Sequence, residues 1–172
     1  MLLAGPGRAD GALLGAGRAD LVAHRRTLGQ LLAETGLLLR AELLRPWARW
    51  ITPPVSPRRY DTAFLVAVVP EGQSADAHTT EAVEATWWHP DEALREWAAG
   101  GMQLMAPTYR TLEQIAEHPT SAALFAAAAD RTIQAIIPQA RRDGSDIVLE
   151  VGEQPEVRMP VDRMPIAERG AL

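Results

Sequence analysis

The segment RPWARWITPPVSPRRYDTAFLVAVVP, residues 45–70, sets two tryptophans and four arginines directly before the most strand-like part of the chain. Residues 48–52 (ARWIT) read as a strand, and Pro53 and Pro54 end it because proline cannot donate to a strand ladder. Residues 60–69 (YDTAFLVAVV) are apolar, with β-branched residues spread through them, a pattern typical of a strand buried on both faces. The segment therefore predicts two strands joined by a proline-rich connection.

The N-terminal part of the chain carries helix signals after an irregular start. Residues 4–20 are rich in glycine, alanine, arginine and aspartate, and they predict a flexible loop. Asp20 can cap a short helix that runs to Arg26. Thr27 can cap a second helix, and Gly36 is placed to stop it.

The part of the chain beyond the quoted segment predicts one more strand, then helices, then a hairpin. A polar loop is expected over 70–80, and residues 84–89 (EATWWH) read as a third strand. Proline is well placed at the first turn of a helix, so Pro90 and Pro107 each open one. The remaining expectations are a helix over 121–130, a hairpin over 133–151 with Asp143 and Gly144 in its turn, and a flexible tail over 152–172.

Three strands interleaved with helices and followed by a hairpin indicate an α/β or α+β layered domain. We expect one domain over 1–151, in which 4–36 forms a loop and helical insertion, with 152–172 outside it.

Composition limits the classes of partner. The chain has 172 residues and a net charge of −5, so general attraction to nucleic acid or to an anionic membrane is disfavoured. It has no cysteine, which excludes disulfides and thiolate metal sites. No stretch approaches the ~18 apolar residues of a spanning helix, and the start lacks the pattern of a signal peptide. We therefore expect a cytoplasmic protein.

The candidate site residues are arginines and one carboxylate. Arg49 alternates with apolar residues on a predicted strand, and Arg58 and Arg59 stand at the mouth of the next strand. Guanidinium groups bind phosphate oxygens in bidentate fashion, although surface salt bridges explain these positions equally well. Glu81 lies in a loop just before a predicted strand, where a catalytic side chain could be aimed at a pocket.

Metal-ligand patterns are weak. The four histidines are widely spaced and fit surface or strand-end positions better than metal ligation. Asp91, Glu92 and Glu96 follow Pro90, where negative charge favours the helix dipole. A substitute metal site over 81–96 is a further, weaker alternative.

Several motifs resemble a branch of the Nudix hydrolase superfamily similar to the coenzyme A diphosphatases. They are LRPWARWITPPVSPRRYDTAFLVAVVPEGQ, EATWWHPDEAL and LMAPTYRTLEQIA, which together cover most of 37–118. One departure is Ala106, which stands where the family usually has a proline.

The resemblance implies a partial Nudix-type α/β/α sandwich with a mixed sheet. It also implies Mg²⁺ or Mn²⁺ as cofactor and hydrolysis of a small-molecule diphosphate, such as a nucleoside diphosphate linked to another group or a coenzyme A-like compound. Arg49, Arg58, Arg59 and Asp61 would then bind the substrate, and Glu81 would take the proton of the attacking water.

The Nudix signature itself, with its Arg-Glu-x-x-Glu-Glu string, does not occur in the sequence, so no metal ligand can be assigned. In the family an apolar V-L-L-A stretch follows that signature, and this chain begins MLLAGP, so we expect it to start just after the catalytic helix. The alternative is an inactive fragment that acts as a binding or interaction module. A missing neighbour would also leave the strand over 60–69 with an open edge, through which copies of the chain could associate or aggregate.

Overall fold

The computed structural model describes residues 3–4, 11–54, 58–69, 86–152 and 154–163. The chain divides into two compact units. The first comprises Met1–Leu44 and Ala67–Thr86, and the second comprises Arg45–Val66 and Trp87–Leu172. No helix of the described residues is both long enough and apolar enough to cross a membrane.

The first unit contains two helices and a short antiparallel pairing. Its elements are β1 (Leu3–Ala4), α1 (Gly11–Val22), α2 (Leu28–Thr35), β2 (Leu38–Leu39) and the 3₁₀ turn η1 (Ala41–Leu43), with β1 paired to β2. The capping signals of α2 are confirmed. The Thr27 side chain and that of Gln30 form a capping box, and Gly36 ends the helix at a φ of 65°.

The prediction of a flexible loop over 4–20 is wrong for the part that α1 occupies. Gly17 is buried, and a Cβ added there would lie 2.6 Å from Cδ1 of Leu31 on α2. The glycine therefore lets the two helices approach closely, and burial of Leu31 stabilises a helix that composition alone disfavours.

The second unit is built on a mixed sheet. It consists of β3 (Arg45–Ile51), β4 (Asp61–Val66) and β5 (Ala135–Ile136), in the order β4–β3–β5. β3 pairs antiparallel with β4 and parallel with β5. The two strands predicted in the opening segment are thus confirmed as an antiparallel pair, and β3 lies at the centre.

Two strand predictions need correction. β4 ends at Val66, and most of its residues are exposed instead of buried on both faces. Among the described residues it pairs with β3 alone, which leaves its outer edge without a neighbour there.

The predicted strand over 84–89 is also wrong where it can be assessed. Residues 86–89 form no strand, and Trp87 is 70% exposed.

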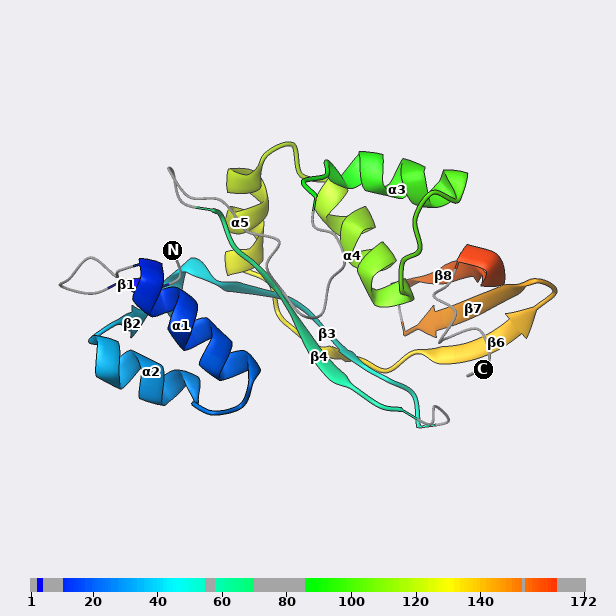
Figure 1. Ribbon diagram of the computed structural model, residues 1–172. Coiled ribbons are helices and arrows are strands. Elements are labelled where there is room, and N and C mark those ends of the chain that lie inside the picture. The colour runs from blue at the N-terminus through cyan, green and yellow to red at the C-terminus, as the bar shows by residue number, and fades with distance from the viewer. Residues whose placement is uncertain (1–2, 5–10, 55–57, 70–85, 153, 164–172) are drawn as a thin grey trace. The chain divides into compact units, whose positions relative to one another are not determined.

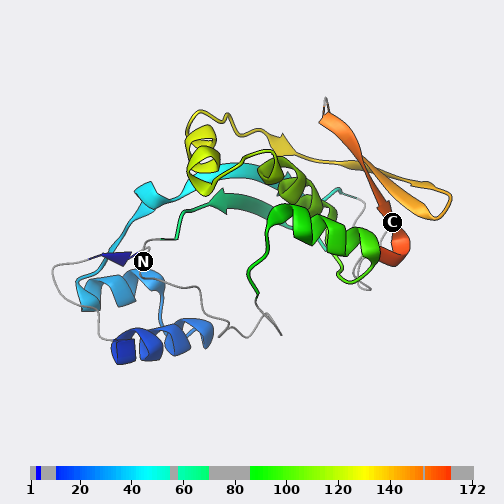
Figure 2. The same cartoon turned by 90° about the horizontal axis from the view of Figure 1, so that it is seen from above.

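Three helices follow, close to the predicted bounds: α3 (Pro90–Ala99), α4 (Ala106–Ala116) and α5 (Ser121–Ala129). Figures 1 and 2 show α4 and α5 over the same side of the β3–β4 ribbon. The guanidinium of Arg45 lies 4.7 Å from the ring centroid of Phe125, which ties α5 to β3. The indole rings of Trp47 and Trp50 are buried between these layers. The tryptophans of β3 are therefore core residues.

The C-terminal part forms an antiparallel sheet of β6 (Gln139–Asp143), β7 (Asp146–Val151) and β8 (Gln154–Pro160), which leads into the 3₁₀ turn η2 (Val161–Arg163). The predicted hairpin is confirmed, with its two-residue loop one position later than expected, at Gly144 and Ser145. The flexible tail predicted from residue 152 is wrong for β8 and η2, because Val157 and Met159 are buried in the core.

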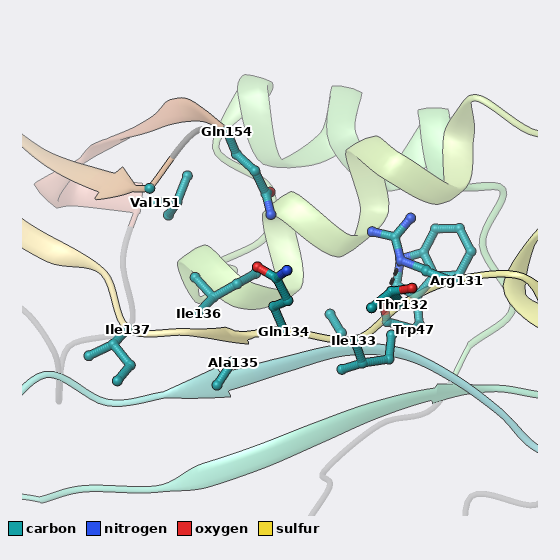
Figure 3. Close-up of a pocket in the computed structure, with 12 residues that line it drawn as sticks. Trp47, Arg131, Thr132, Ile133, Gln134, Ala135, Ile136, Ile137, Val151 and Gln154 are labelled. Atoms are coloured by element: carbon teal, nitrogen blue, oxygen red, sulfur yellow. Dashed lines mark hydrogen bonds between the residues drawn. The ribbon is translucent and has the colours of Figure 1, made fainter.

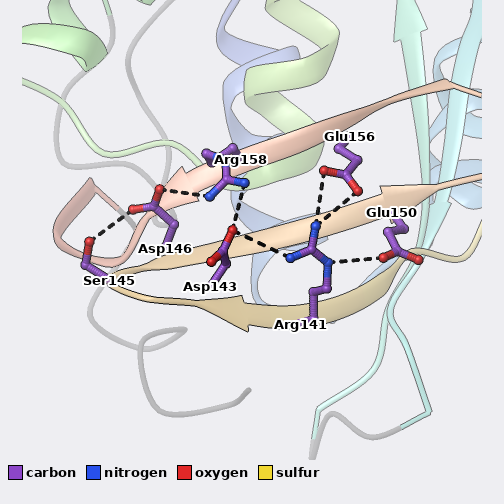
Figure 4. Close-up of polar contacts among 7 residues, drawn as sticks. All are labelled: Arg141, Asp143, Ser145, Asp146, Glu150, Glu156 and Arg158. Atoms are coloured by element: carbon purple, nitrogen blue, oxygen red, sulfur yellow. Dashed lines mark hydrogen bonds and ion pairs between the residues drawn. The ribbon is translucent and has the colours of Figure 1, made fainter.

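The outer face of this sheet carries a charge network (Figure 4). Arg141 pairs with Glu150 and Glu156, and Arg158 pairs with Asp143 and Asp146. Val148 stands directly opposite both arginines in the strand register and is fully buried, although it lies outside the main core. Long arginine side chains can cover apolar surface with their stems, so the network shields this valine.

Within the described residues, the five α-helices, the mixed sheet and the antiparallel sheet together confirm the predicted α/β (α+β) class. The arrangement is compatible with a Nudix-type α/β/α layering.

Candidate functional site

Two of the predicted substrate-binding residues, Arg49 and Asp61, contact each other. Arg49 on β3 stands opposite Ala63, so Asp61 is its diagonal neighbour on β4. Arg49 Nε donates to Asp61 Oδ1 at 2.8 Å, and Arg49 Nη2 donates to Oδ2 at 2.5 Å. The hydrogen bond to Arg49 holds the pKa of Asp61 below its ordinary value, and the same bond raises the pKa of Arg49.

The other predicted residues lie in the connection between β3 and β4 or outside the described residues. Arg59 Nε donates to the carbonyl oxygen of Thr52 at 3.1 Å, and Thr52 also bonds the backbone of Tyr60. Arg58 is exposed beside it. Glu81 lies outside the described residues. The structure therefore brings Arg49 and Asp61 together. Arg59 lies two residues before Asp61 and bonds across the connection between the two strands.

A groove on the second unit is formed by a different set of residues (Figure 3). Its volume is about 700 Å³, which is within the range of small-molecule sites. It lies beside β5, between β3 and the end of β7. The lining residues are Trp47, Ala48, Arg131, Thr132, Ile133, Gln134, Ala135, Ile136, Ile137, Val151, Gly152 and Gln154.

The cationic group of this groove is Arg131, which is fixed by three contacts. Its Nε donates to the carbonyl oxygen of Trp47 at 2.6 Å, and its Nη2 donates to Oε1 of Gln114 at 3.1 Å. Its guanidinium carbon lies 4.2 Å from the ring centroid of Trp47. The guanidinium is therefore held over the indole ring, a cation–π contact that arginine favours.

Gln114 on α4 connects this cation to the opposite wall of the groove. Its side-chain oxygen accepts from Trp47 Nε1 at 3.2 Å as well as from Arg131, which directs its nitrogen toward Oε1 of Gln154 at 3.5 Å. His118 packs edge-on against Trp47, with 5.7 Å between the ring centroids. The network fixes the side chains that surround the guanidinium.

Within the described part of the chain, the contacts of Arg131 are those with Trp47 and Gln114, and no ion pair with a carboxylate is among them. Of its five N–H groups, two are used by the contacts above, so the others remain able to donate. A guanidinium with spare donors beside a groove can bind an oxyanion in bidentate fashion.

Sequence reasoning identified neither Arg131 nor the polar role of Trp47. The contact between the two joins positions 84 residues apart. The sequence offers no local signal for it, because Arg131 is one of 17 arginines and follows an alanine-rich helix with no motif around it.

The implied cofactor does not fit the described residues. None of the described side chains form a group of three or more metal-ligating residues. Asp91 and Glu92 lie in the first turn of α3, where their negative charge favours the helix dipole, as the sequence predicts. These residues therefore provide no site for Mg²⁺ or Mn²⁺, and no catalytic step is assigned to a metal here.

Comparison with known proteins relates the chain to Nudix hydrolases. It is 28% identical over 76 residues to the acyl-coenzyme A diphosphatase NUDT19 of Xenopus laevis, a match that covers 42% of this chain and 20% of that protein. It is 30% identical over 100 residues to nudix hydrolase 7 of Caenorhabditis elegans, which covers 58% of this chain and 32% of the relative. The chain thus spans between a fifth and a third of the length of these relatives. No family model matches it. No solved structure matches it either.

Proposed function

We propose that this chain is the substrate-binding portion of a Nudix-type hydrolase that cleaves a diphosphate linkage in a nucleoside diphosphate derivative or a coenzyme A-like compound. The observation that carries the proposal is the local similarity to a protein named as an acyl-coenzyme A diphosphatase. The order of elements from β3 to α4, with arginines on an exposed hairpin, supports it.

The charge of the substrate gives the arginines their role. A diphosphate is polyanionic, so water attacks it readily only when that charge is neutralised and the phosphate is held in place. Arg49, Arg58 and Arg59 are exposed along one hairpin. They can neutralise the charge of the phosphates and hold them in place. Asp61 keeps the Arg49 guanidinium in one orientation through its two hydrogen bonds.

Glu81 is proposed as the base that takes the proton of the attacking water. A divalent cation would supply Lewis-acid chemistry in the intact enzyme. The described residues hold no site for such an ion.

The test measures hydrolysis and binding on this chain. Coenzyme A, ADP-ribose and a nucleotide sugar are each incubated with Mg²⁺, the products are separated by chromatography, and titration calorimetry measures the affinities. Because the sequence lacks the Nudix signature and the described residues hold no metal site, the proposal expects hydrolysis near background together with binding that Arg49→Gln weakens at least tenfold. Arg95→Gln is the matched control, because Arg95 is exposed on α3 and its substitution removes the same charge. Equal affinities in Arg49→Gln and Arg95→Gln contradict the substrate role of Arg49.

A second candidate function is that of a non-catalytic binding module. It is favoured by the groove, where Arg131 is oriented for an anion by its contacts with Trp47 and Gln114 without any metal. Binding of the same compounds that Arg131→Gln weakens and Arg49→Gln does not would favour this alternative over the hydrolase.

A further inference from the structure

We infer that the groove beside β5 is a ligand site for an oxyanion joined to a nonpolar group, such as an alkyl phosphate or a carboxylate with a hydrocarbon chain. The inference rests on this groove and holds whether or not the chain hydrolyses a diphosphate. It names a cation, Arg131, that neither the motifs nor the hairpin includes.

The two ends of the groove differ in chemistry. Figure 3 shows Arg131 over Trp47 at one end, and Ile137 and Val151 at the other. Ile136 lies between them on β5. A ligand that filled the groove would therefore meet a cation at one end and aliphatic side chains at the other.

The cationic end is arranged before any ligand binds. Arg131 is held by the backbone oxygen of Trp47, by Gln114, and by the indole ring beneath it. A guanidinium that is already oriented loses little rotamer freedom on binding, and this favours affinity. Because the described residues offer it no carboxylate, an incoming anion displaces no internal ion pair.

The nonpolar end gives a reason for the ligand to carry a hydrocarbon group. Ile137 follows β5 and is 53% exposed. Covering this surface and the neighbouring Ile136 would remove apolar area from water, which is favourable in proportion to that area. Inorganic phosphate has no hydrocarbon group, so its binding would gain no free energy from the burial of apolar area.

Binding is measured by isothermal titration of the full chain with hexyl phosphate, hexanoate, inorganic phosphate and 1-hexanol. We expect hexyl phosphate to bind about tenfold more tightly than inorganic phosphate, through burial of its chain, and more tightly than 1-hexanol. Comparison of hexyl phosphate with hexanoate then identifies which oxyanion the site prefers. Equal affinity for inorganic phosphate, or for 1-hexanol, would overturn the inference.

Arg131→Gln should weaken hexyl phosphate binding by about tenfold or more, the range for a lost charged hydrogen bond. Arg95→Gln serves as the charge-matched control and should bind as the parent does. Because Arg131 also contacts Trp47, a second variant leaves those contacts intact: Gln134→Glu places a carboxylate on the groove wall. This variant should also weaken binding of hexyl phosphate and of hexanoate and leave binding of 1-hexanol unchanged. Unchanged affinity in Gln134→Glu, or in a folded Arg131→Gln protein, would refute the site.

Discussion

Arg131 lies over the indole of Trp47, with its guanidinium carbon 4.2 Å from the ring centroid and its Nε donating to the carbonyl oxygen of the same residue. One tryptophan thus serves as a core side chain, a hydrogen-bond donor to Gln114 and a support for the cation. Its ring is 1% exposed, so the packing of β3 and the geometry of the groove depend on the same residue.

The first prediction follows from that double role. Trp47→Ala should lower the free energy of unfolding by about 3–5 kcal/mol, as expected for a buried aromatic side chain that leaves a cavity. Trp88→Ala, at a residue that is 46% exposed, should change it by less than about 0.5 kcal/mol. Urea denaturation followed by circular dichroism measures both. Similar losses in the two variants would show that Trp47 is not a central packing residue.

The second prediction concerns the pair of Arg49 and Asp61. Asp61→Asn should strengthen binding of pyrophosphate several-fold, because it removes a negative charge and releases the Arg49 donors. Arg49→Gln should weaken it. Titration calorimetry on the two variants makes the comparison, with Arg95→Gln as control. Identical affinities in all three would assign the pair to the stability of the β3–β4 hairpin alone.

That pair also has a defined acid dependence. The hydrogen bond from Arg49 lowers the pKa of Asp61, so the contribution of the pair is present above the ordinary carboxyl range and is lost as pH falls through the lowered value. In Asp61→Asn this acid-dependent loss should disappear. The thermal midpoint, measured in steps from pH 6 to pH 3, would show a smaller decline in the variant. An equal decline would contradict the assignment.

The third prediction concerns alkaline pH. Burial, with a further contribution from Glu113, raises the pKa of Tyr109 to about 12. Tyr109 packs against Trp97 with 4.4 Å between their ring centroids. Its protonated form is favoured in the folded state, so the stabilisation is present below about pH 10 and is lost as pH rises toward 12. Absorbance at the tyrosinate band should show a late step that Tyr109→Phe removes. A variant that keeps the late step would disprove the assignment.

Local signals explain the parts of the fold that sequence predicted well. The Thr27 cap and the Gly36 stop act within one helix, and Pro90 fixes the start of α3, so each can be read without knowledge of its surroundings. The two-residue loop of the β6–β7 hairpin was found for the same reason, although one position early.

Contacts distant in sequence explain what sequence did not predict. The apolar run at 60–69 reads as buried, yet burial depends on neighbours that the described residues do not supply to β4. Taken alone, Gly17 disfavours a helix. In the structure it allows the close approach of Leu31, which the sequence does not show. The site divides in the same way. The arginines of the hairpin belong to a sequence motif, whereas the role of Arg131 follows only from its contact with Trp47 on β3.

The fourth prediction concerns the end of α3. Gly100 has a φ of 87°, and a Cβ there would lie 2.9 Å from Nη1 of Arg163. That same nitrogen donates to the carbonyl oxygens of Trp97 and Ala98. Gly100→Ala should destabilise the protein by roughly 1 kcal/mol or more, through backbone strain and loss of this cap.

Gly29→Ala is the control for that substitution. Gly29 lies in the first turn of α2 with no atom within 4 Å of an added Cβ, so the change should be neutral or stabilising. Chemical denaturation of the two variants supplies the comparison. A neutral Gly100→Ala would mean that Arg163 does not depend on the glycine to reach the helix end.

The last prediction separates a flexible tail from an integral strand. Burial of one large apolar side chain contributes about 1.5–3 kcal/mol, so loss of Val157 and Met159 together removes about 3–6 kcal/mol from a total of about 5–15 kcal/mol. Both side chains are buried in β8. A chain that ends at Gly152 should therefore unfold at a much lower temperature than one that ends at Arg163, and with less cooperativity. Met159→Ala in the full chain controls for chain length, with an expected loss of about 2–5 kcal/mol. Equal melting of the two shortened chains would restore the tail interpretation, because β8 would then contribute nothing that the core requires.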